Sequence, residues 1–337
     1  MTAQKPVLNS SSRVYVAGHR GLVGSAVVRA LKAVGVTDLA LRTSSELDLR
    51  EREAVREYME QVRPDVVVLA AARVGGILAN STYPVHFLSD NLRIQVNVLD
   101  AAREVGVQHL LFLGSSCIYP KHAPQPIRED ALLSGPLEAT NETYAIAKIS
   151  GILQVQAVRR QFGLPWISAM PTNLYGPGDN FHLTDSHVLP AMIRKFHEAR
   201  FSGGSVTLWG SGSARREFLY VDDLASACLH LIDHYDDPRH INIGTGHDIT
   251  IEELAGIIAT TVSYDGEIVW DASKPDGTPR KLLDVGRIES LGWKPQVRLQ
   301  DGIRATYNWY VTHQAELRGL NSKSAGRAAR IDLESRG

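Results

Sequence analysis

The sequence predicts an α/β protein built on a doubly wound parallel sheet, with a smaller α/β lobe beside it. Segments typical of strands and of helices alternate through the first half of the chain, which is the pattern of parallel strands joined by crossover helices. Several strands are continuous apolar runs such as "DVVVLAA" (65–71), as in a sheet covered on both faces. Right-handed crossovers then place helices on both sides of the sheet.

The individual elements follow from the periodicity of the apolar residues. "RVYVAG" is a short apolar run, whereas "LVGSAVVRALKAVG" after it has helical spacing and closes on Gly35. In the first half, strands are expected at 13–18, 39–43, 65–71, 109–116 and 165–171, and helices at 22–35, 50–62, 83–106 and 142–163. After a Gly-, Asn- and Asp-rich loop, we expect a helix at 188–200, strands at 205–210 and 240–244, and a strand leading into a helix over 218–232.

The order of these strands and helices predicts two structural units whose segments alternate along the chain. Residues 11–180 plus about 217–245 should form the Rossmann-type domain with the large sheet. Residues from about 181 to 216, plus 246–315, should form the smaller, substrate-binding lobe. The polar ends, residues 1–10 and 319–337, are expected to be mobile.

Composition narrows the class of protein. The 337 residues carry a formal net charge of −1, so no overall field attracts nucleic acid or an anionic membrane, and neither partner is predicted. No apolar run approaches the ~20 residues of a membrane span, and the N-terminal segment lacks the apolar stretch of a signal peptide. The only two cysteines, Cys117 and Cys228, suit a reducing compartment. We therefore expect a cytoplasmic protein, and we predict no metal site.

Three glycines between the first strand and the first helix predict a dinucleotide site. In "VYVAGHRGLVG" they have the spacing G-x-x-G-x-x-G. A turn without side chains lets the backbone approach a pyrophosphate, whose charge the helix N-terminus stabilises. Such a triplet also fits an ordinary tight turn, but here strand, turn and helix occur in the order that binding requires. The residues expected to contact the cofactor are Gly18, His19, Arg20, Gly21, Leu22, Val23 and Gly24.

The end of the second predicted strand favours NADP(H) as the cofactor. An enzyme that uses NAD usually places Asp or Glu there, on the ribose 2′-hydroxyl. This chain has Arg42 in "LALRTSSELDL". A guanidinium suits a 2′-phosphate, which a carboxylate would repel. Arg20 in the glycine loop could join it, although either arginine could equally be a solvated surface charge.

Tyr144 and Lys148 form a candidate catalytic pair. They lie at i and i+4 in "NETYAIAKISG", on one face of a predicted helix. A nearby ammonium favours the phenolate, so we expect Lys148 to lower the pKa of Tyr144. Ser115 or Ser116, at the end of the fourth strand, could hold a substrate oxygen beside the phenol. Tyr-x-x-x-Lys is common by chance, and the specific signal is its occurrence together with the glycine loop and these serines.

With these motifs the chain resembles the extended short-chain dehydrogenase/reductase family, whose members mostly act on nucleotide sugars. The resemblance covers about Arg13 to Tyr310. The 4,6-dehydratases of the family carry an Asp-Glu pair where this chain has Ser116 and Cys117, and its 4-epimerases hold NAD, which Arg42 disfavours. The long stretches "AAARVGGILANSTYP", "LGSSCIYPK", "MPTNLYGPGDNFH", "WGSGSARREFLYVDDLA" and "PDGTPRKLLDV" resemble the GDP-L-fucose synthase subfamily.

That resemblance implies a substrate and a role for each site residue. The substrate would be GDP-4-keto-6-deoxy-D-mannose, inverted at C3 and C5 with Cys117 as base and His187 as acid. Reduction of the C4 ketone would then use Tyr144 as proton donor, assisted by Ser115 and Lys148. The resemblance further implies cofactor contacts at Leu113, Gly114, Ser115, Ser116, Lys148, Pro171, Thr172, Asn173, Leu174 and His187, and GDP-sugar contacts at Lys195, Trp209, Arg216, Asp276 and Lys281.

Several alternatives stay open from the sequence. A lone cysteine is most often a small buried residue, and a lone loop histidine a surface residue. Sequence does not decide whether Arg215 or Arg216 faces the ligand. The rival functions are a nucleotide-sugar 4-ketoreductase or 4-epimerase without 3,5-epimerase activity, and more remotely a non-catalytic NADP-sensing module. The resemblance also implies a homodimer formed through the helix of Asp90 and the helix of Tyr144.

Overall fold

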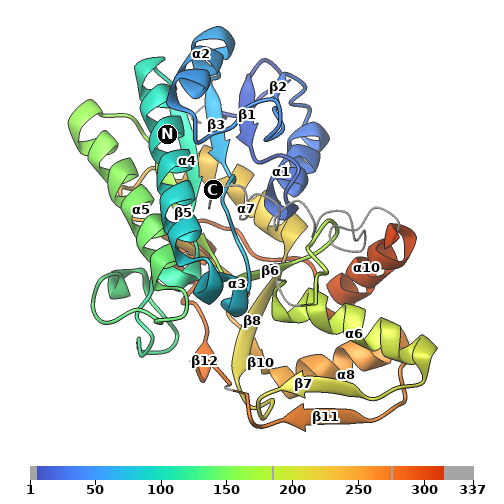
Figure 1. Cartoon of the computed structure of the whole chain (residues 1–337). Helices are drawn as coiled ribbons and strands as arrows, with labels where there is room; N and C mark the ends of the chain where they lie inside the picture. The colour runs from blue at the N-terminus through green and yellow to red at the C-terminus, as the bar shows by residue number, and fades with distance from the viewer. Residues whose placement is uncertain (1–5, 184–185, 275, 315–337) are drawn as a thin grey trace, which may run out of the picture.

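The computed structural model describes residues 6–183, 186–274 and 276–314, and its backbone confirms the predicted α/β class. One parallel sheet has six strands in the order β2-β1-β3-β4-β5-β9 (Figure 1). Their bounds are β1 Val14–Ala17, β2 Leu39–Ala40, β3 Val66–Leu69, β4 His109–Leu113, β5 Ile167–Pro171 and β9 Ile241–Ile243. Strands β2 and β3 flank β1 on opposite sides, so the chain direction across the sheet switches at β1.

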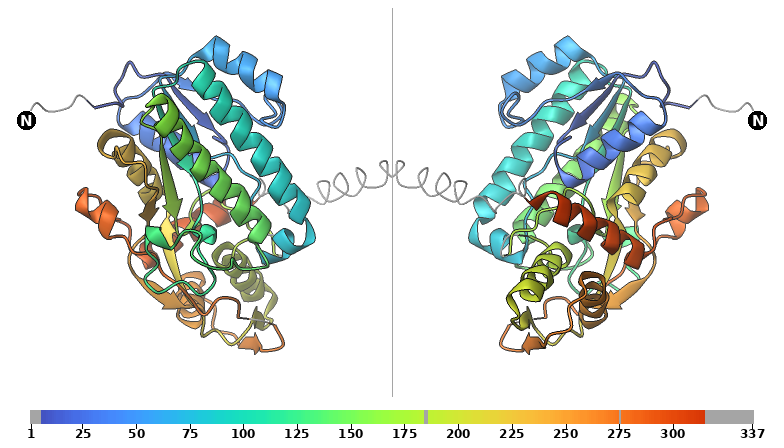
Figure 2. Two further views of the ribbon diagram at one scale, coloured as in Figure 1. Left: turned by 90° about the vertical axis from the view of Figure 1, so that its left-hand side faces the viewer. Right: turned by 90° about the vertical axis from the view of Figure 1, so that its right-hand side faces the viewer.

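Helices cover both faces of this sheet, because side chains alternate along each strand. Val14 and Val16 of β1 join the core beneath α1 and α7, whereas Tyr15 and Ala17 join the core beneath α2, α4 and α5. Figure 2 shows α4 and α5 side by side on one flank of the molecule. The helix bounds are α1 Leu22–Ala33, α2 Arg52–Val62, α4 Pro84–Glu104, α5 Glu142–Phe162 and α7 Val221–His234.

The smaller lobe has its own core between two small sheets and three helices. Strand β8 pairs with β6, β10 and β12, and β7 pairs with β11. The strands are β6 Asn173–Tyr175, β7 Val206–Trp209, β8 Arg215–Tyr220, β10 Asp248–Thr250, β11 Ile268–Asp271 and β12 Arg280–Lys281. The helices are α6 Val188–Ser202, α8 Ile251–Val262 and α10 Leu299–Thr312, and the remaining short helices of the described chain are α3 Ile77–Thr82, η1 Ser116–Ile118, η2 Glu129–Ala131 and α9 Gly286–Ser290.

The interleaving of the two units is visible at β8, α7 and β9. Strand β8 lies in the smaller lobe, α7 directly after it packs on the large sheet, and β9 joins that sheet. Residues 6–10, which we expected to be mobile, contact the body: Leu8 is buried and its N–H donates to Asp233 at 3.0 Å. The other predicted mobile residues, 1–5 and 319–337, lie outside the described residues. No helix in the described ranges has the length and apolarity needed to cross a membrane.

Candidate active site

The glycine loop forms a bare cradle at the carboxyl end of β1. Gly18 has φ +86°, a conformation that favours glycine, and a Cβ there would lie 2.8 Å from the Cα of Ala71 after β3. A Cβ on Gly24 would lie 2.2 Å from the Gly18 carbonyl oxygen, so α1 can pack this closely only without a side chain. The cradle opens where the strand order switches, which is where open α/β sheets bind ligands.

Other features of the loop fit a dinucleotide. His19 Nδ1 is buried and has no hydrogen-bond partner among the described residues, so it could meet a ligand atom. Leu22 and Val23, half-buried in the first turn of α1, pack against the core and fix the helix N-terminus behind the loop. The backbone N–H groups of that N-terminus suit a pyrophosphate.

Arg42 lies where a 2′-phosphate would be expected. It is exposed just beyond β2, with its guanidinium 5.1 Å from the ring centroid of Tyr58. Its neighbour Thr43 donates its N–H to the Glu46 carboxylate at 2.8 Å. The pKa of Glu46 is lowered first by the Thr43 N–H and hydroxyl, and further by the charges of Arg42 and Arg20. Both arginines therefore stabilise negative charge at the end of β2.

Tyr144 and Lys148 lie together in the interior on α5. Their exposed fractions are only 8% and 4%, and Lys148 Nζ lies 5.9 Å from the Tyr144 ring centroid. Nζ also donates to the Leu113 carbonyl oxygen at 2.7 Å, which ties the pair to the end of β4. Burial lowers the pKa of Lys148 to about 7. The helix therefore brings the predicted pair together at the edge of the large sheet.

The expected lowering of the Tyr144 pKa by Lys148 is wrong for this environment. Burial raises the pKa of Tyr144, the charge of a Cys117 thiolate raises it further, and a hydrogen bond with Ser115 only partly opposes them. Burial that lowers the lysine pKa also weakens the ammonium as a source of positive charge. The phenol therefore stays protonated near neutral pH, which is the state needed for a proton donor. Of the two serines, Ser115 is the one that affects the pKa of Tyr144, whereas Ser116 is buried.

Cys117 lies in η1, partly exposed, between two hydrogen-bond donors. Asn141 Nδ2 lies 3.3 Å and Lys281 Nζ 3.6 Å from its sulfur. Both contacts donate to sulfur, which is the arrangement that a thiolate requires. Cys228 is its opposite, because it is fully buried on α7 and burial raises its pKa to about 12. Sequence reasoning missed Asn141, although its place three residues before Tyr144, at the start of α5, was a usable signal.

A pocket opens beside the Cys117 sulfur. Lys121 and Glu138 form an ion pair at 3.0 Å in its wall. Burial opposes ionisation of Glu138, but hydrogen bonds from Lys121, Thr140 and Thr278 and the charge of Lys121 together lower its pKa. Among the residues that line the pocket are Cys117, Tyr119, Lys121, Glu138, Asn141, Thr278, Arg280 and Lys281.

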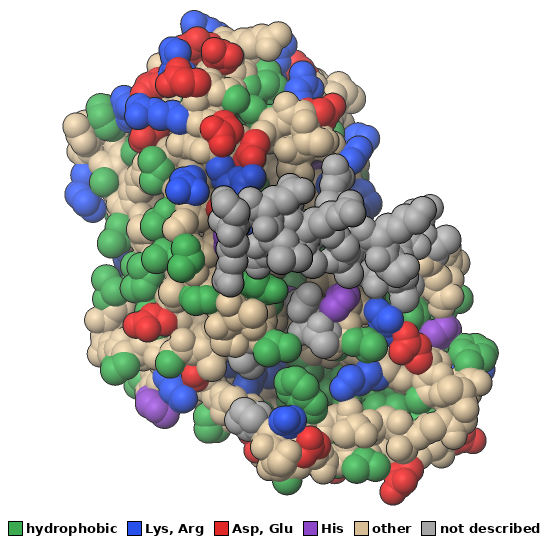
Figure 3. All heavy atoms as spheres, in the orientation of Figure 1, with side chains coloured by type: hydrophobic (Ala, Val, Ile, Leu, Met, Phe, Trp, Pro, Cys, Tyr) green, Lys and Arg blue, Asp and Glu red, His purple; other side chains and the backbone are tan. Residues whose placement is uncertain are grey.

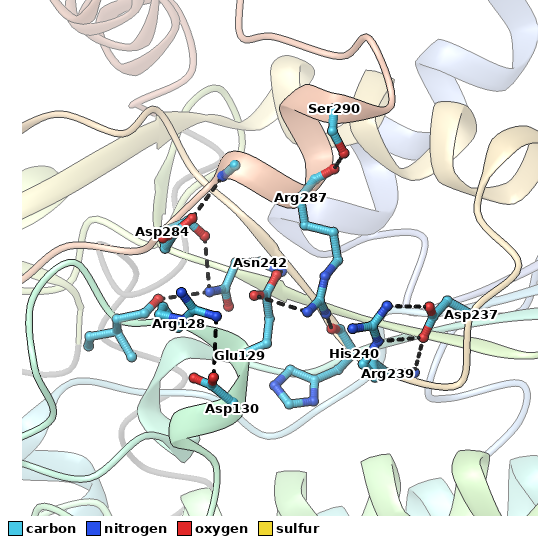
Figure 4. Close-up of polar contacts among 12 residues, drawn as sticks. Arg128, Glu129, Asp130, Asp237, Arg239, His240, Asn242, Asp284, Arg287 and Ser290 are labelled. Atoms are coloured by element: carbon cyan, nitrogen blue, oxygen red, sulfur yellow. Dashed lines mark hydrogen bonds and ion pairs between the residues drawn. The ribbon is translucent and has the colours of Figure 1, made fainter.

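A buried polar network connects the segment that follows Cys117 to the large sheet. The Tyr119 hydroxyl donates to Asn242 Oδ1 at 2.5 Å, and the Asn242 N–H donates to Glu129 at 3.2 Å. Figure 4 shows Arg287 between Glu129 and His240; its guanidinium lies 3.6 Å from the Glu129 carboxylate and donates to the His240 carbonyl at 2.9 Å. These contacts join η1 and η2 to β9, so the Cys117 turn rests on the large sheet.

His187 stands at the N-terminus of α6, on the smaller lobe. The residue is exposed, but its ring lies close enough to the surrounding protein for desolvation to lower its pKa. The charge of Lys281 lowers the pKa further, which associates His187 with the residue that also contacts Cys117. A lower pKa makes the protonated imidazole a stronger acid.

The pairing of β8 with β12 places Arg215 and Arg216 on opposite faces of the strand. Lys281 is in register with Arg216, and Arg280 with Arg215, so the two pairs point to opposite faces. Arg215 and Arg280 both bind Asp248, at 2.9 and 2.5 Å. Arg216 instead shares the face of Lys281, and burial lowers its pKa. Arg216 is therefore the arginine on the Cys117 side.

The other residues predicted to bind substrate or cofactor have contacts of their own elsewhere in the two units. Lys195 Nζ donates to the Thr207 carbonyl at 2.9 Å, and Trp209 is 57% exposed with Lys274 Nζ at 5.8 Å from its ring centroid. Asp276 accepts hydrogen bonds from the N–H and hydroxyl of Ser211, at 2.6 and 2.9 Å, and so closes the turn after β7. Leu113 and Gly114 lie at the carboxyl end of β4 and Pro171 and Thr172 at that of β5, whereas Asn173 and Leu174 belong to β6, which pairs with β8.

These observations agree with the comparison against protein families. Residues 14–244 match the model of the NAD dependent epimerase/dehydratase family, and the chain belongs to that family. It is 58% identical over 305 residues to a probable GDP-L-fucose synthase 1 of Oryza sativa subsp. japonica, covering 90% of this chain and 93% of the relative. It is 52% identical to the GDP-L-fucose synthase of Escherichia coli (strain K12), covering 92% and 100%.

A solved structure gives the same picture. The crystal structure of a GDP-L-fucose synthetase from Naegleria fowleri bound to NADP superimposes with a TM-score of 0.86 at 28% identity, covering 92% of this chain and 97% of that chain. The Rossmann-type sheet and its smaller lobe are thus shared with an NADP-bound relative.

Proposed function

We propose that the chain is a GDP-L-fucose synthase, which converts GDP-4-keto-6-deoxy-D-mannose to GDP-L-fucose with NADPH. The observation that carries this proposal is the juxtaposition at one strand end. The Cys117 sulfur has an amide and an ammonium donor at 3.3 and 3.6 Å, and the Cys117 N–H donates to Ser115 Oγ, the hydroxyl that also lowers the pKa of the buried Tyr144. Names of relatives that are 58% and 52% identical support the same activity.

Epimerisation comes first, because the ketone at C4 acidifies the protons at C3 and C5. Cys117 as thiolate removes one proton, and His187 as imidazolium returns another to the opposite face of the same carbon. The enediolate oxygen formed in between accepts hydrogen bonds from Tyr144 and Ser115. Exchange of protons with solvent resets the thiolate and the imidazolium before the second centre reacts. The partial exposure of Cys117 and the exposure of His187 permit that exchange.

Reduction follows at C4. A bound NADPH supplies the hydride, and the cradle of Gly18, Gly21 and Gly24 with Arg20 and Arg42 would hold it. Tyr144 gives its proton to the new alkoxide, since burial keeps the phenol protonated until then. Ser115 orients the substrate oxygen. Lys148, held by the Leu113 carbonyl at 2.7 Å, supports the phenolate as it forms.

Binding of the GDP part is assigned to the cations beside the pocket. Arg216 and Lys281 share one face of the β8–β12 pair, and a pyrophosphate needs such convergent positive charge. Lys195, Trp209 and Asp276 are proposed to line the outer part of the site. A 4-ketoreductase or 4-epimerase without 3,5-epimerase activity would not need the hydrogen-bond donors around Cys117. A non-catalytic NADP-sensing module would not need the intact Tyr144–Lys148 pair.

Solvent isotope incorporation tests both halves of the activity at once. The enzyme is incubated with GDP-4-keto-6-deoxy-D-mannose and NADPH in deuterated water. A reduced product with deuterium at C3 and C5 is expected. Reduced product without deuterium at either carbon would reject the epimerase half, and unchanged NADPH would reject the reductase half.

A homodimer and a cytoplasmic location complete the proposal. Three exposed apolar side chains, Val96 of α4 and Ile146 and Leu153 of α5, are 40–44% exposed on neighbouring helices. In Figure 3 hydrophobic side chains gather on the side where Figure 1 places α4 and α5. A second copy covering this face would bury them, and sedimentation of the wild type against Leu153→Glu tests the dimer. The free thiols of Cys117 and Cys228 suit a reducing compartment.

A further inference from the structure

Glu217 is a buried carboxylate that the proposed chemistry does not use. It lies on β8 directly after Arg216, its side chain is fully buried, and it forms no ion pair with any residue in the described ranges. Burial raises its pKa, although four hydrogen bonds to the carboxylate oppose this. An unpaired buried carboxylate is costly, so the contacts that hold it need an explanation.

Both oxygens of Glu217 accept backbone N–H groups from two other segments. Oε1 accepts from Thr245 at 2.6 Å and from Gly246 at 2.8 Å, in the loop after β9. Oε2 accepts from Leu283 at 3.1 Å, just past the end of β12. A Cβ on Gly244 would lie 2.2 Å from Oε1, so the loop fits around this carboxylate only as glycine.

The contact at Leu283 matters because β12 is a strand of only two residues. Its registered pairs with β8 are Arg280 with Arg215 and Lys281 with Arg216. Beyond Lys281 the Leu282 N–H donates to Gln125, and the Leu283 N–H donates to the carboxylate of Glu217, the next residue of β8. Lys281 is the residue whose Nζ lies 3.6 Å from the Cys117 sulfur.

We propose that Glu217 is a positioning residue for Cys117: its carboxylate fixes the end of β12, so that the Lys281 ammonium stays beside the sulfur. Glu217 does not touch Cys117 and acts only through Lys281. The proposal rests on the proposed function in taking Cys117 as the reacting thiol. It adds that the reactivity of Cys117 is controlled from β8, the strand that also carries Arg216.

Alkylation of Cys117 by iodoacetamide at pH 7 tests this in the full chain without substrate. Cys228 is fully buried and provides an unreactive internal reference. Glu217→Gln keeps the volume but turns an NH₂ group toward N–H donors, so β12 should shift. We expect alkylation to slow by at least about fivefold, the factor for losing one solvated charge pair near 4 Å. The matched control, Glu253→Gln, removes an exposed carboxylate that accepts an N–H in the same lobe and should react like wild type.

A double-mutant cycle separates positioning from a merely structural role. Lys281→Met alone should slow alkylation, and adding Glu217→Gln should slow it no further, because both changes remove the same contact. An equal further loss in the Lys281→Met background, or an unchanged rate in Glu217→Gln, would overturn the proposal. Glu217→Asp, which keeps the charge but cannot reach both segments, replaces Glu217→Gln in the same cycle if that variant does not fold.

The alkylation experiment can be interpreted whether or not the chain makes GDP-L-fucose. Thermal unfolding and fluorescence titration with NADPH show whether each variant is folded and binds cofactor. If wild type incorporates no deuterium at C3 and C5, the proposed epimerisation fails, while the coupling of Glu217, Lys281 and Cys117 is still measured by alkylation. If deuterium is incorporated but the cycle is additive, the positioning role fails alone.

Discussion

The two parts of the proposed activity rest on regions that are built differently. Tyr144 and Lys148 share one helix turn and are almost fully buried, with Tyr144 packed on Phe87 and Lys148 held by the end of β4. Cys117, His187 and Lys281 come from three segments far apart in the chain, and Cys117 and His187 reach solvent. Burial suits a phenol that must hold its proton until a ketone accepts hydride. A thiol and an imidazole that must exchange protons repeatedly need access to water and to charge.

The largest effect is expected in the buried region. Tyr144→Phe removes the proton donor for the alkoxide and should lower the rate of reduction roughly a thousandfold, within the range for loss of a general acid. Stopped-flow measurement of NADPH oxidation checks this. NADPH binding should be unchanged, since the ring that packs on Phe87 is retained. A near-normal rate would remove Tyr144 as the donor and with it the contrast between the two regions.

The second-largest effect is expected at Cys117, in the solvent-exposed region. Cys117→Ser keeps the contact geometry but replaces a thiol with a far less acidic hydroxyl, so deuterium incorporation at C3 and C5 should fall about a hundredfold or more. Mass spectrometry of the recovered nucleotide sugar measures it. Cys228→Ala is the control, because that thiol is buried away from the site and should leave incorporation intact. Normal incorporation in Cys117→Ser would exclude the thiol as base.

The buried pair could be predicted from the sequence better than the site around Cys117, because the pair is local in the chain and the Cys117 site is not. Tyr144 and Lys148 were found because i and i+4 residues meet on any helix. The contact of Lys281 with Cys117 joins residues 164 positions apart, and no local pattern encodes it. The raised pKa of Tyr144 also escaped prediction, because burial is a property of the assembled fold.

The fold was predicted more fully than the site. Apolar periodicity placed the strands and helices of the large sheet, since each strand is covered on both faces by local crossover helices. Strand β2 is shorter than predicted: only Leu39 and Ala40 pair with β1, because the chain leaves the sheet edge toward Arg42. Sequence left Arg215 and Arg216 equivalent, and the structure distinguishes them by the register with β12 and by the ion pair of Arg215 with Asp248.

A smaller effect distinguishes these two arginines. Arg216→Met should weaken GDP binding about tenfold, the value for losing one charge-assisted contact to phosphate. Arg215→Met should change it by less than about twofold, because its guanidinium is already bound to Asp248 on the other face. Isothermal titration calorimetry with GDP measures both. Equal losses would show that the β8–β12 register does not decide which cation faces the ligand.

The smallest effect concerns the buried region and its dependence on pH. In the unfolded chain Lys148 loses its proton near pH 10.5, but in the folded chain near pH 7. Between these values the unfolded chain binds more protons, so this group makes stability rise with pH from about 7, by at most about 1.4 kcal/mol per pH unit. Lys148→Met removes that contribution, so the wild type minus variant difference in unfolding free energy should grow in favour of wild type from pH 7 to pH 9.

Denaturant unfolding at pH 7, 8 and 9 measures this difference, and subtraction removes the titration of groups that both proteins share, Asp179 and the histidines included. Lys148→Met also loses the hydrogen bond to Leu113, which shifts every point equally and does not alter the slope. A slope of zero would mean that Lys148 keeps its proton when folded. The Lys148 ammonium would then be fully charged beside Tyr144. Both regions would then hold a charged lysine beside the reacting group, Lys148 beside Tyr144 and Lys281 beside Cys117.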